Sequence, residues 1–149
     1  MTNPKTINVF IIEDNADDLY FIKKALSDER YILHEITSGI DAFNYLLNPE
    51  IIPDIVLLDY RLPGMDGLEI LEKLGEKKKD YGFIFLTVDN TIETAVKVMK
   101  AGALDFIIKS ADLKNELHEK IEKVYEIHKT KIEKLQLQKS LSDCSFPLY

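Results

Sequence analysis

The stretch PDIVLLDYRLPGMDG, residues 53–67, is a short apolar run that ends on an acid, Asp59, and continues into a loop rich in glycine and proline. Three other apolar runs also end on residues that handle metal or phosphate: 9–12 leads into Glu13 and Asp14, 83–86 into Thr87, and 106–108 into Lys109. Fully apolar runs of this length are typical of strands buried on both faces of a parallel sheet. Ligands of such open sheets bind just beyond the carboxyl ends of the strands. We therefore expect three acids, a hydroxyl and an ammonium to meet at one edge.

Segments with strand character alternate with segments of helical pattern along the whole chain. We expect strands at about 7–12, 31–36, 54–58, 83–87 and 104–108, and helices at about 16–27, 42–47, 68–74, 91–101 and from 111 onward. This alternation predicts an α/β fold with a doubly wound, five-stranded parallel sheet and right-handed crossovers. The charged run Lys77–Asp80 is expected to be a solvated loop.

Two of the helices carry further signals. Asn15 suits a helix cap, and Asp17 and Asp18 suit the positive end of the helix dipole. The inner faces are expected to be Leu19, Ile22 and Leu26 for the first helix and Ala95, Val98 and Met99 for the fourth. Gly102 is a natural stop for the fourth helix.

The final helical pattern is longer than the domain needs. Its apolar stripe would pack on the sheet as far as Val124, and the pattern continues to about Lys139, roughly 28 residues or ~42 Å. We therefore assign residues 1–127 to a domain and 128–149 to an extension, which ends in an irregular tail from Asp143. Heptad spacing holds for about two heptads and fits a linker and a short dimerising coiled coil equally; its residues are Tyr125, His128, Ile132 and Leu135.

Composition narrows the class of protein. The net charge of -7 argues against a surface that binds nucleic acid directly. The longest apolar runs are about four to six residues, against the roughly 20 that cross a bilayer. A single cysteine, Cys144, cannot form an internal disulfide, which is typical of a reducing compartment. These features predict a cytoplasmic protein with no membrane contact.

The expected site favours phosphoryl chemistry. Three acids at one sheet edge repel one another, and a hard divalent cation such as Mg²⁺ or Mn²⁺ relieves that repulsion. No His or Cys lies near these strand ends, which disfavours zinc and copper. A cation, the Lys109 ammonium and the Thr87 hydroxyl would neutralise and orient a phosphoryl group. Asp59 stands alone before its loop and is the best candidate for the nucleophile that forms an acyl phosphate.

These residues together resemble the receiver domain of bacterial two-component response regulators. The resemblance runs from about Ile7 to Ile127 and rests on Glu13-Asp14, Asp59 with Leu62-Pro63-Gly64-Met65-Asp66-Gly67, Thr87, and Ala101-Gly102-Ala103 ahead of Lys109. It implies a flavodoxin-like sheet of strand order 2-1-3-4-5.

The resemblance also implies a role for each site residue. Asp59 would accept a phosphoryl group from a histidine kinase or a phosphotransfer protein. Asp14, Asp59 and the Arg61 backbone carbonyl would bind Mg²⁺, assisted through water by Glu13. Thr87 and Lys109 would contact the phosphoryl oxygens. Phe106 would be a switch aromatic that rotates inward as Thr87 moves, although a plain core phenylalanine is the competing interpretation. The face around the last strand and helix would then regulate a partner or an output domain.

The sequence departs from the family pattern beside the site. Ser110 follows Lys109 where the family usually has proline, so we expect a trans peptide bond there. Val88 stands where a small residue is usual, and we expect it to narrow access to Asp59 and slow phosphorylation by small donors. Arg61 and Asp89 are expected to tune the lifetime of the acyl phosphate.

Other functions fit the sequence less well. A phosphatase of the haloacid dehalogenase type needs a second acid where Arg61 stands, and a dinucleotide-binding domain needs glycines after the first strand. A receiver-like scaffold that no longer uses phosphate, or a dimerisation module, is the main alternative. His118 and His128 are interpreted as solvated or packing residues rather than phosphohistidines. We therefore predict a signalling domain rather than an enzyme, which assists only its own phosphorylation and dephosphorylation.

Overall fold

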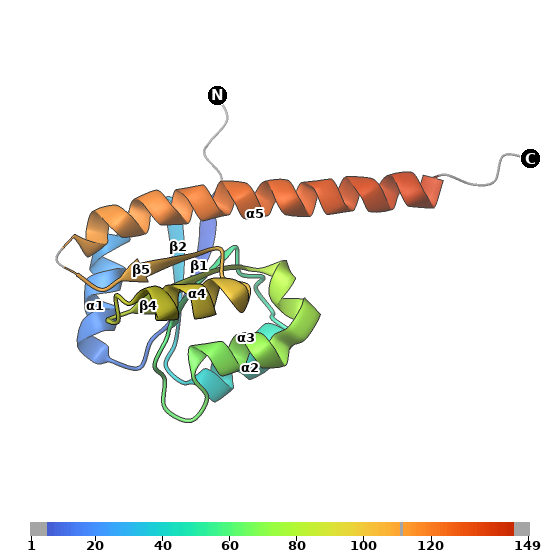
Figure 1. The fold of residues 1–149 in the computed structure, drawn as a ribbon. Helices are drawn as coiled ribbons and strands as arrows, with labels where there is room; N and C mark the ends of the chain where they lie inside the picture. The colour runs from blue at the N-terminus through green and yellow to red at the C-terminus, as the bar shows by residue number, and fades with distance from the viewer. Residues whose placement is uncertain (1–5, 111, 145–149) are drawn as a thin grey trace, which may run out of the picture.

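The computed structural model describes residues 6–110 and 112–144. Its elements are β1 (Ile7–Ile12), α1 (Ala16–Ala25), β2 (Tyr31–Ile36), α2 (Gly39–Leu47), β3 (Ile55–Asp59), α3 (Gly67–Leu74), the 3₁₀ helix η1 (Gly75–Asp80), β4 (Gly82–Thr87), α4 (Ile92–Lys100), β5 (Asp105–Ile108) and α5 (Leu113–Cys144). The strands are all parallel and lie in the order β2-β1-β3-β4-β5 (Figure 1), which confirms the predicted topology.

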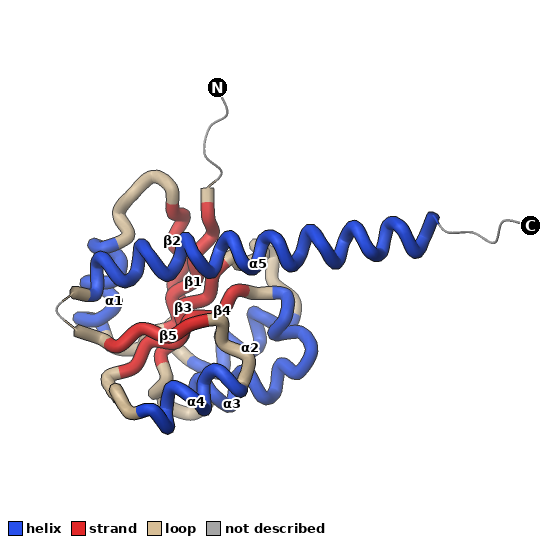
Figure 2. Tube along the Cα trace, turned by 45° about the horizontal axis from the view of Figure 1, so that its top comes forward, coloured by secondary structure: helices blue, strands red, loops and turns tan. Residues whose placement is uncertain are grey.

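Helices cover both faces of this sheet and enclose two apolar cores. Because successive strand residues point to opposite faces, Val9 and Ile11 contact the core under α1 and α5, whereas Phe10 and Ile12 contact the core under α2, α3 and α4. The two layers of helices can be followed in Figure 2. The site-bearing strands are therefore held from both sides, which fixes the positions of their carboxyl ends.

The structure changes three local expectations. Asp59 is the last residue of β3 rather than the first of the following loop. Lys77–Asp80 lies within η1 rather than in an irregular loop. On α4, Val98 is buried as expected, but Met99 is exposed and Thr94 takes the inward position, because its hydroxyl is satisfied by hydrogen bonds there. Gly102 ends the helix as predicted, with a φ of 115° that favours glycine.

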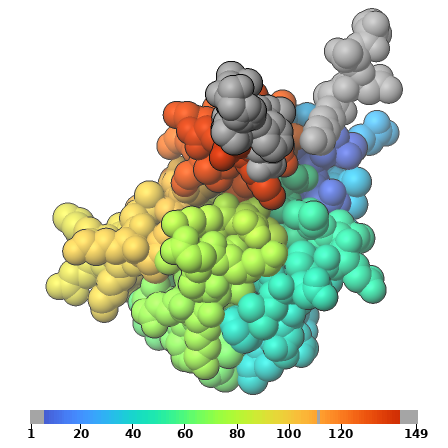
Figure 3. Space-filling view, turned by 90° about the vertical axis from the view of Figure 1, so that its right-hand side faces the viewer, coloured from blue at the N-terminus to red at the C-terminus, as the bar shows by residue number. Residues whose placement is uncertain are grey.

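α5 is longer than expected. It spans 32 residues and reaches Cys144, so the irregular tail predicted from Asp143 does not begin there, and residues 145–149 lie outside the described part. The second half of α5 extends away from the body (Figure 1). Figure 3 looks toward this projecting end, above the yellow-green surface of η1. Neither α5 nor any other helix within the described ranges combines the length and apolar character of a membrane span.

Both α5 histidines are packing residues, as predicted. His118 Nε2 lies 2.8 Å from the carbonyl oxygen of Ala25, which attaches α5 to α1. His128 is buried, with Nε2 2.9 Å from the carbonyl oxygen of Asp80. Close to His128, a groove of about 540 Å³ separates the start of the projecting part from the body and is lined in part by Ile52, Ile132 and Gln136. Contact with the body therefore continues past residue 127.

Candidate functional site

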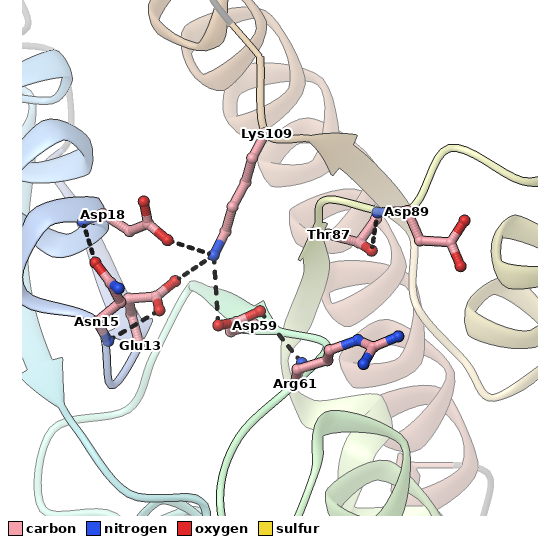
Figure 4. A network of polar contacts seen from close by, with 8 residues as sticks. All are labelled: Glu13, Asn15, Asp18, Asp59, Arg61, Thr87, Asp89 and Lys109. Carbon is pink, nitrogen blue, oxygen red and sulfur yellow. Dashed lines mark hydrogen bonds and ion pairs between the residues drawn. The ribbon is translucent and has the colours of Figure 1, made fainter.

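Four polar side chains meet at the carboxyl ends of the central strands (Figure 4). Glu13 follows β1, Asp59 ends β3, Thr87 ends β4 and Lys109 follows β5. Glu13, Asp59 and Thr87 are buried. The parallel sheet thus brings together the strand-end residues that the sequence singles out.

The Lys109 ammonium is the centre of this network. Its Nζ lies 2.9 Å from Glu13 Oε2, 2.9 Å from Asp18 Oδ2 and 3.4 Å from Asp59 Oδ2. Burial opposes the charged form of Lys109, but hydrogen bonds to Glu13 and Asp18 and the charge of Asp59 outweigh it and raise the lysine pKa. Lys109 is therefore a fixed cation beside the Asp59 carboxylate.

Asp18 is a site residue that the sequence analysis missed. Its place in the first turn of α1 suggested a partner for the helix dipole, yet its side chain points from α1 toward Lys109 (Figure 4). Its position in the sequence could have suggested this role, because Asp18 lies about one helical turn after Glu13 and Asp14, at the same edge of the sheet. The sequence does not give the distance between α1 and the end of β5, and this distance decides whether Asp18 can contact Lys109.

The acids form a cluster that can hold a divalent cation. One carboxylate oxygen each from Glu13, Asp14 and Asp59 lies within 4.8 Å of the others. Hard oxygen donors at this spacing fit a hard cation. Burial raises the pKa of Glu13 to about 7; the Lys109 ammonium opposes this rise, and the neighbouring Asp59 adds to it. The neighbouring acids thus disfavour one another's charged forms, and a bound cation would relieve that repulsion.

The loop after β3 orients Asp59. The backbone N–H of Arg61 donates a 3.2 Å hydrogen bond to Asp59 Oδ1. Gly67 allows the loop to return close to the strand, because a Cβ atom there would lie 2.5 Å from Phe85 Cε1 and 2.8 Å from the Asp59 carbonyl oxygen. One carboxylate oxygen of Asp59 is thereby bound to the backbone and the other faces Lys109.

Thr87 connects the site to α4. Its hydroxyl oxygen accepts a 3.0 Å hydrogen bond from the backbone N–H of Asp89. The Asp89 carboxylate in turn accepts hydrogen bonds from the backbone N–H of Thr91 and the hydroxyl of Thr94, and these bonds lower its pKa. Val88 lies between Thr87 and Asp89 and is 70% exposed.

In the sequence, Phe106 lies three residues before Lys109 and Ser110 directly follows it. Phe106 is half-buried, and Lys120 Nζ lies 5.3 Å from the centre of its ring and donates a 2.7 Å hydrogen bond to its carbonyl oxygen. The Lys109–Ser110 peptide bond is trans, as expected. Lys109 still reaches Asp59.

Comparison with protein families relates this chain to response regulators. The profile of the family described as response regulator receiver domain matches residues 9–122. The chain is 34% identical to regulatory protein LuxO of Vibrio cholerae over 102 residues, 68% of this chain and 22% of LuxO. It is 31% identical to regulatory protein AtoC of Escherichia coli over 137 residues, 91% of this chain and 29% of AtoC. The chain thus spans less than a third of the length of these relatives.

Solved structures share the fold. The signal receiver domain of a LuxO repressor protein from Vibrio parahaemolyticus superposes with a TM-score of 0.76 at 23% identity, over 85% of this chain and 95% of that one. The signal receiver domain of an HD domain-containing protein from Pseudomonas fluorescens superposes with a TM-score of 0.77 at 22% identity, over 89% and 96% of the two chains.

Proposed function

The chain belongs to the response regulator receiver domain family, and we propose that Asp59 is the residue on which it accepts a phosphoryl group from a histidine kinase or a phosphotransfer protein. The observation that carries this proposal is the position of Asp59 Oδ2 at 3.4 Å from the Lys109 ammonium, inside the cluster that Glu13 and Asp14 complete.

The transfer of the phosphoryl group needs only the phosphohistidine of the donor and a proton from solvent. A carboxylate oxygen of Asp59 attacks phosphorus, and the new O–P bond forms as the P–N bond of the phosphohistidine breaks. The electron pair of that bond stays on the imidazole nitrogen, which takes a proton from solvent. Lys109 donates to one phosphoryl oxygen and the Thr87 hydroxyl to another, which stabilises the charge that the transfer brings to the site.

A divalent cation, Mg²⁺ or Mn²⁺, is the cofactor that fits this donor set. Asp14, Asp59 and the backbone carbonyl of Arg61 would hold it, with Glu13 assisting through water. When bound, the cation would neutralise charge on the phosphoryl oxygens. Within the described residues, the cluster of Glu13, Asp14 and Asp59 offers carboxylate oxygens, which are the hard donors that such a cation prefers.

The signal would leave the site through Thr87 and Phe106. To donate to the phosphate, the Thr87 hydroxyl turns toward Asp59 and gives up the hydrogen bond from Asp89 N–H. Phe106 then rotates into the space behind it, and the surface of α4, β5 and α5 changes. Val88, Arg61 and Asp89 would set access to Asp59 and the lifetime of the acyl phosphate. An unchanged dephosphorylation rate in both Arg61→Ala and Asp89→Ala would remove that role from Arg61 and Asp89.

The domain would act as a signalling component rather than as an enzyme. We assign residues 1–127 to the receiver and 128–149 to an extension, which joins an output domain or pairs with a second copy of the chain. We further propose a cytoplasmic location, with no membrane contact and no direct contact with nucleic acid. The net charge of -7 supports the last point.

Intact-mass measurement tests the phosphoryl transfer. The protein is incubated with Mg²⁺ and phosphoramidate beside the variant Asp59→Ala and a sample without Mg²⁺. We expect a labile gain of one phosphoryl group in the wild type and in neither control. A folded wild-type protein that gains nothing would contradict the proposal and favour a scaffold that no longer uses phosphate. Turnover of a small phosphate ester would instead favour a phosphatase.

A further inference from the structure

We propose that Asp18 is a positioning residue for the phosphoryl transfer, because it holds the Lys109 ammonium from the α1 side and directs it at Asp59. This inference rests on the proposed function of Asp59. The observation behind it is the 2.9 Å contact between Asp18 Oδ2 and Lys109 Nζ, which is as short as the contact of Lys109 with Glu13.

Three acceptors surround the three N–H groups of the ammonium. The bonds to Glu13 and Asp18 are both 2.9 Å long, whereas Asp59 Oδ2 lies at 3.4 Å. Two short bonds orient an ammonium on a flexible four-carbon stem, so the third N–H is aimed at Asp59. The longest of the three contacts is the one that a phosphoryl oxygen on Asp59 would replace.

Asp18 differs from the other two partners of Lys109 in one respect. Glu13 and Asp59 both belong to the acidic cluster, and Asp18 does not. Once Glu13 and Asp59 are engaged with a cation, Asp18 is the carboxylate that remains free to hold Lys109. The side chain of Lys109 is only 13% exposed and that of Asp18 is 40% exposed, so the pair lies at the rim of the site, partly shielded from solvent.

The chain offers a matched control. Asp17 precedes Asp18 in the first turn of α1, is exposed, and is not among the partners of Lys109. Asp17→Asn and Asp18→Asn remove the same charge from the same helical turn, and both keep the volume of the side chain. Only Asp18→Asn removes the ion pair. In addition, Asp18→Glu keeps the charge on a longer side chain.

The first test is the rate of phosphorylation by phosphoramidate at saturating Mg²⁺, followed by intact mass. In this step the O–P bond to Asp59 forms as the P–N bond breaks, and ammonia leaves after taking a proton. We expect Asp18→Asn to slow the reaction about tenfold, Asp18→Glu to recover part of the rate, and Asp17→Asn to stay within about twofold of wild type. Phosphoramidate is a small molecule and brings no protein surface that could dock on α1, so we expect the effect to report on Lys109.

The dissociation constant of Mg²⁺ separates this role from a general electrostatic one. Because Asp18 lies outside the acidic cluster, Asp18→Asn should leave Mg²⁺ affinity within about twofold of Asp17→Asn. An equal loss of rate in Asp17→Asn and Asp18→Asn, or a rate for Asp18→Asn that equals or exceeds that of wild type, would overturn the inference.

A second measurement is independent of phosphorylation. Acetylation of the Lys109 amine by a water-soluble active ester, followed by peptide mass spectrometry, reports how firmly the side chain is held. We expect several-fold faster acetylation of Lys109 in Asp18→Asn than in Asp17→Asn. An equal acetylation rate in the two variants would overturn the inference about Asp18. A wild-type protein that accepts no phosphoryl group would contradict only the proposed function, and the acetylation rates would still test the role of Asp18.

Discussion

The Asp89 carboxylate accepts a 2.8 Å hydrogen bond from the hydroxyl of Thr94, in the first turn of α4. The Asp89 carboxylate also accepts a hydrogen bond from the backbone N–H of Thr91, and the backbone N–H of Asp89 donates one to the Thr87 hydroxyl oxygen. A continuous chain of hydrogen bonds therefore runs from the end of β4 to the start of α4. These hydrogen bonds connect the candidate phosphorylation site directly to α4, a helix on the surface.

Removal of the Asp89 carboxylate should loosen the start of α4. In Asp89→Ala the Thr91 amide loses its acceptor, so we expect hydrogen exchange at Thr91 to become several-fold faster, because local opening is easier there. Arg61→Ala is the control, since no hydrogen bond joins the Arg61 side chain to α4 in the described residues. Exchange that is equal in the two variants would show that Asp89 does not support α4.

Shortening Val88 should speed phosphorylation. The side chain follows Thr87 directly and is 70% exposed, so its removal opens the approach to Asp59 without disturbing a core. We expect Val88→Ala to react severalfold faster with acetyl phosphate and phosphoramidate, measured by intact mass over time. An unchanged rate would mean that Val88 does not limit access.

Lys120 should bias the position of Phe106. Its ammonium lies over the Phe106 ring, a contact of ~0.5–1 kcal/mol that holds the ring in its half-buried position. We expect Lys120→Ala to bind the phosphoryl mimic beryllofluoride about two- to fivefold more tightly, because the inward position becomes easier to reach. Lys123→Ala is the matched control: Lys120 and Lys123 both form an ion pair with Asp105 at 3.3 Å, but within the described residues only Lys120 lies over the Phe106 ring. Equal affinities in the two variants would contradict this expectation.

Charge removal at Asp14 should stabilise the metal-free protein. Asp14→Asn reduces the repulsion within the acidic cluster, so we expect a Tm higher by about 2–4 °C without metal. The same change removes a ligand, so Mg²⁺ should raise the Tm of the variant less than that of the wild type. Asp17→Asn should behave like wild type. A full Mg²⁺ response in Asp14→Asn would place the cation elsewhere.

His128 should make stability sensitive to mild acid. Burial lowers the pKa of His128, against the smaller opposing effect of the hydrogen bond to the Asp80 carbonyl; Asp54, Asp80 and Lys131 are the charged groups that face it. Because the unfolded chain then binds the proton more readily, stability is full above the unfolded histidine pKa of about 6.5 and is lost as the pH falls below it. Urea unfolding between about pH 7.5 and 5.5 should show a smaller loss for His128→Gln than for wild type. An equal loss would assign the acid sensitivity to other groups.

The sequence by itself determined the sheet and the residues at its edge. Apolar runs of strand length follow from the local pattern, and the carboxyl ends of parallel strands share an edge of the sheet. The sequence alone therefore places Glu13, Asp59, Thr87 and Lys109 together. The strand order itself came from the resemblance to receiver domains, and the structure confirms it.

Only the tertiary structure decided which side chains pair across that edge. Asp18 and Lys109 are 91 residues apart, and their contact depends on how α1 lies against the end of β5, which no local pattern encodes. Likewise the inward position on α4 went to Thr94 rather than Met99, because a hydroxyl that finds Asp89 can be buried at little cost. Periodicity predicts which face of a helix is buried. The exact rotation of the helix about its axis, which decides which side chain on that face makes a contact, depends on packing against the rest of the molecule.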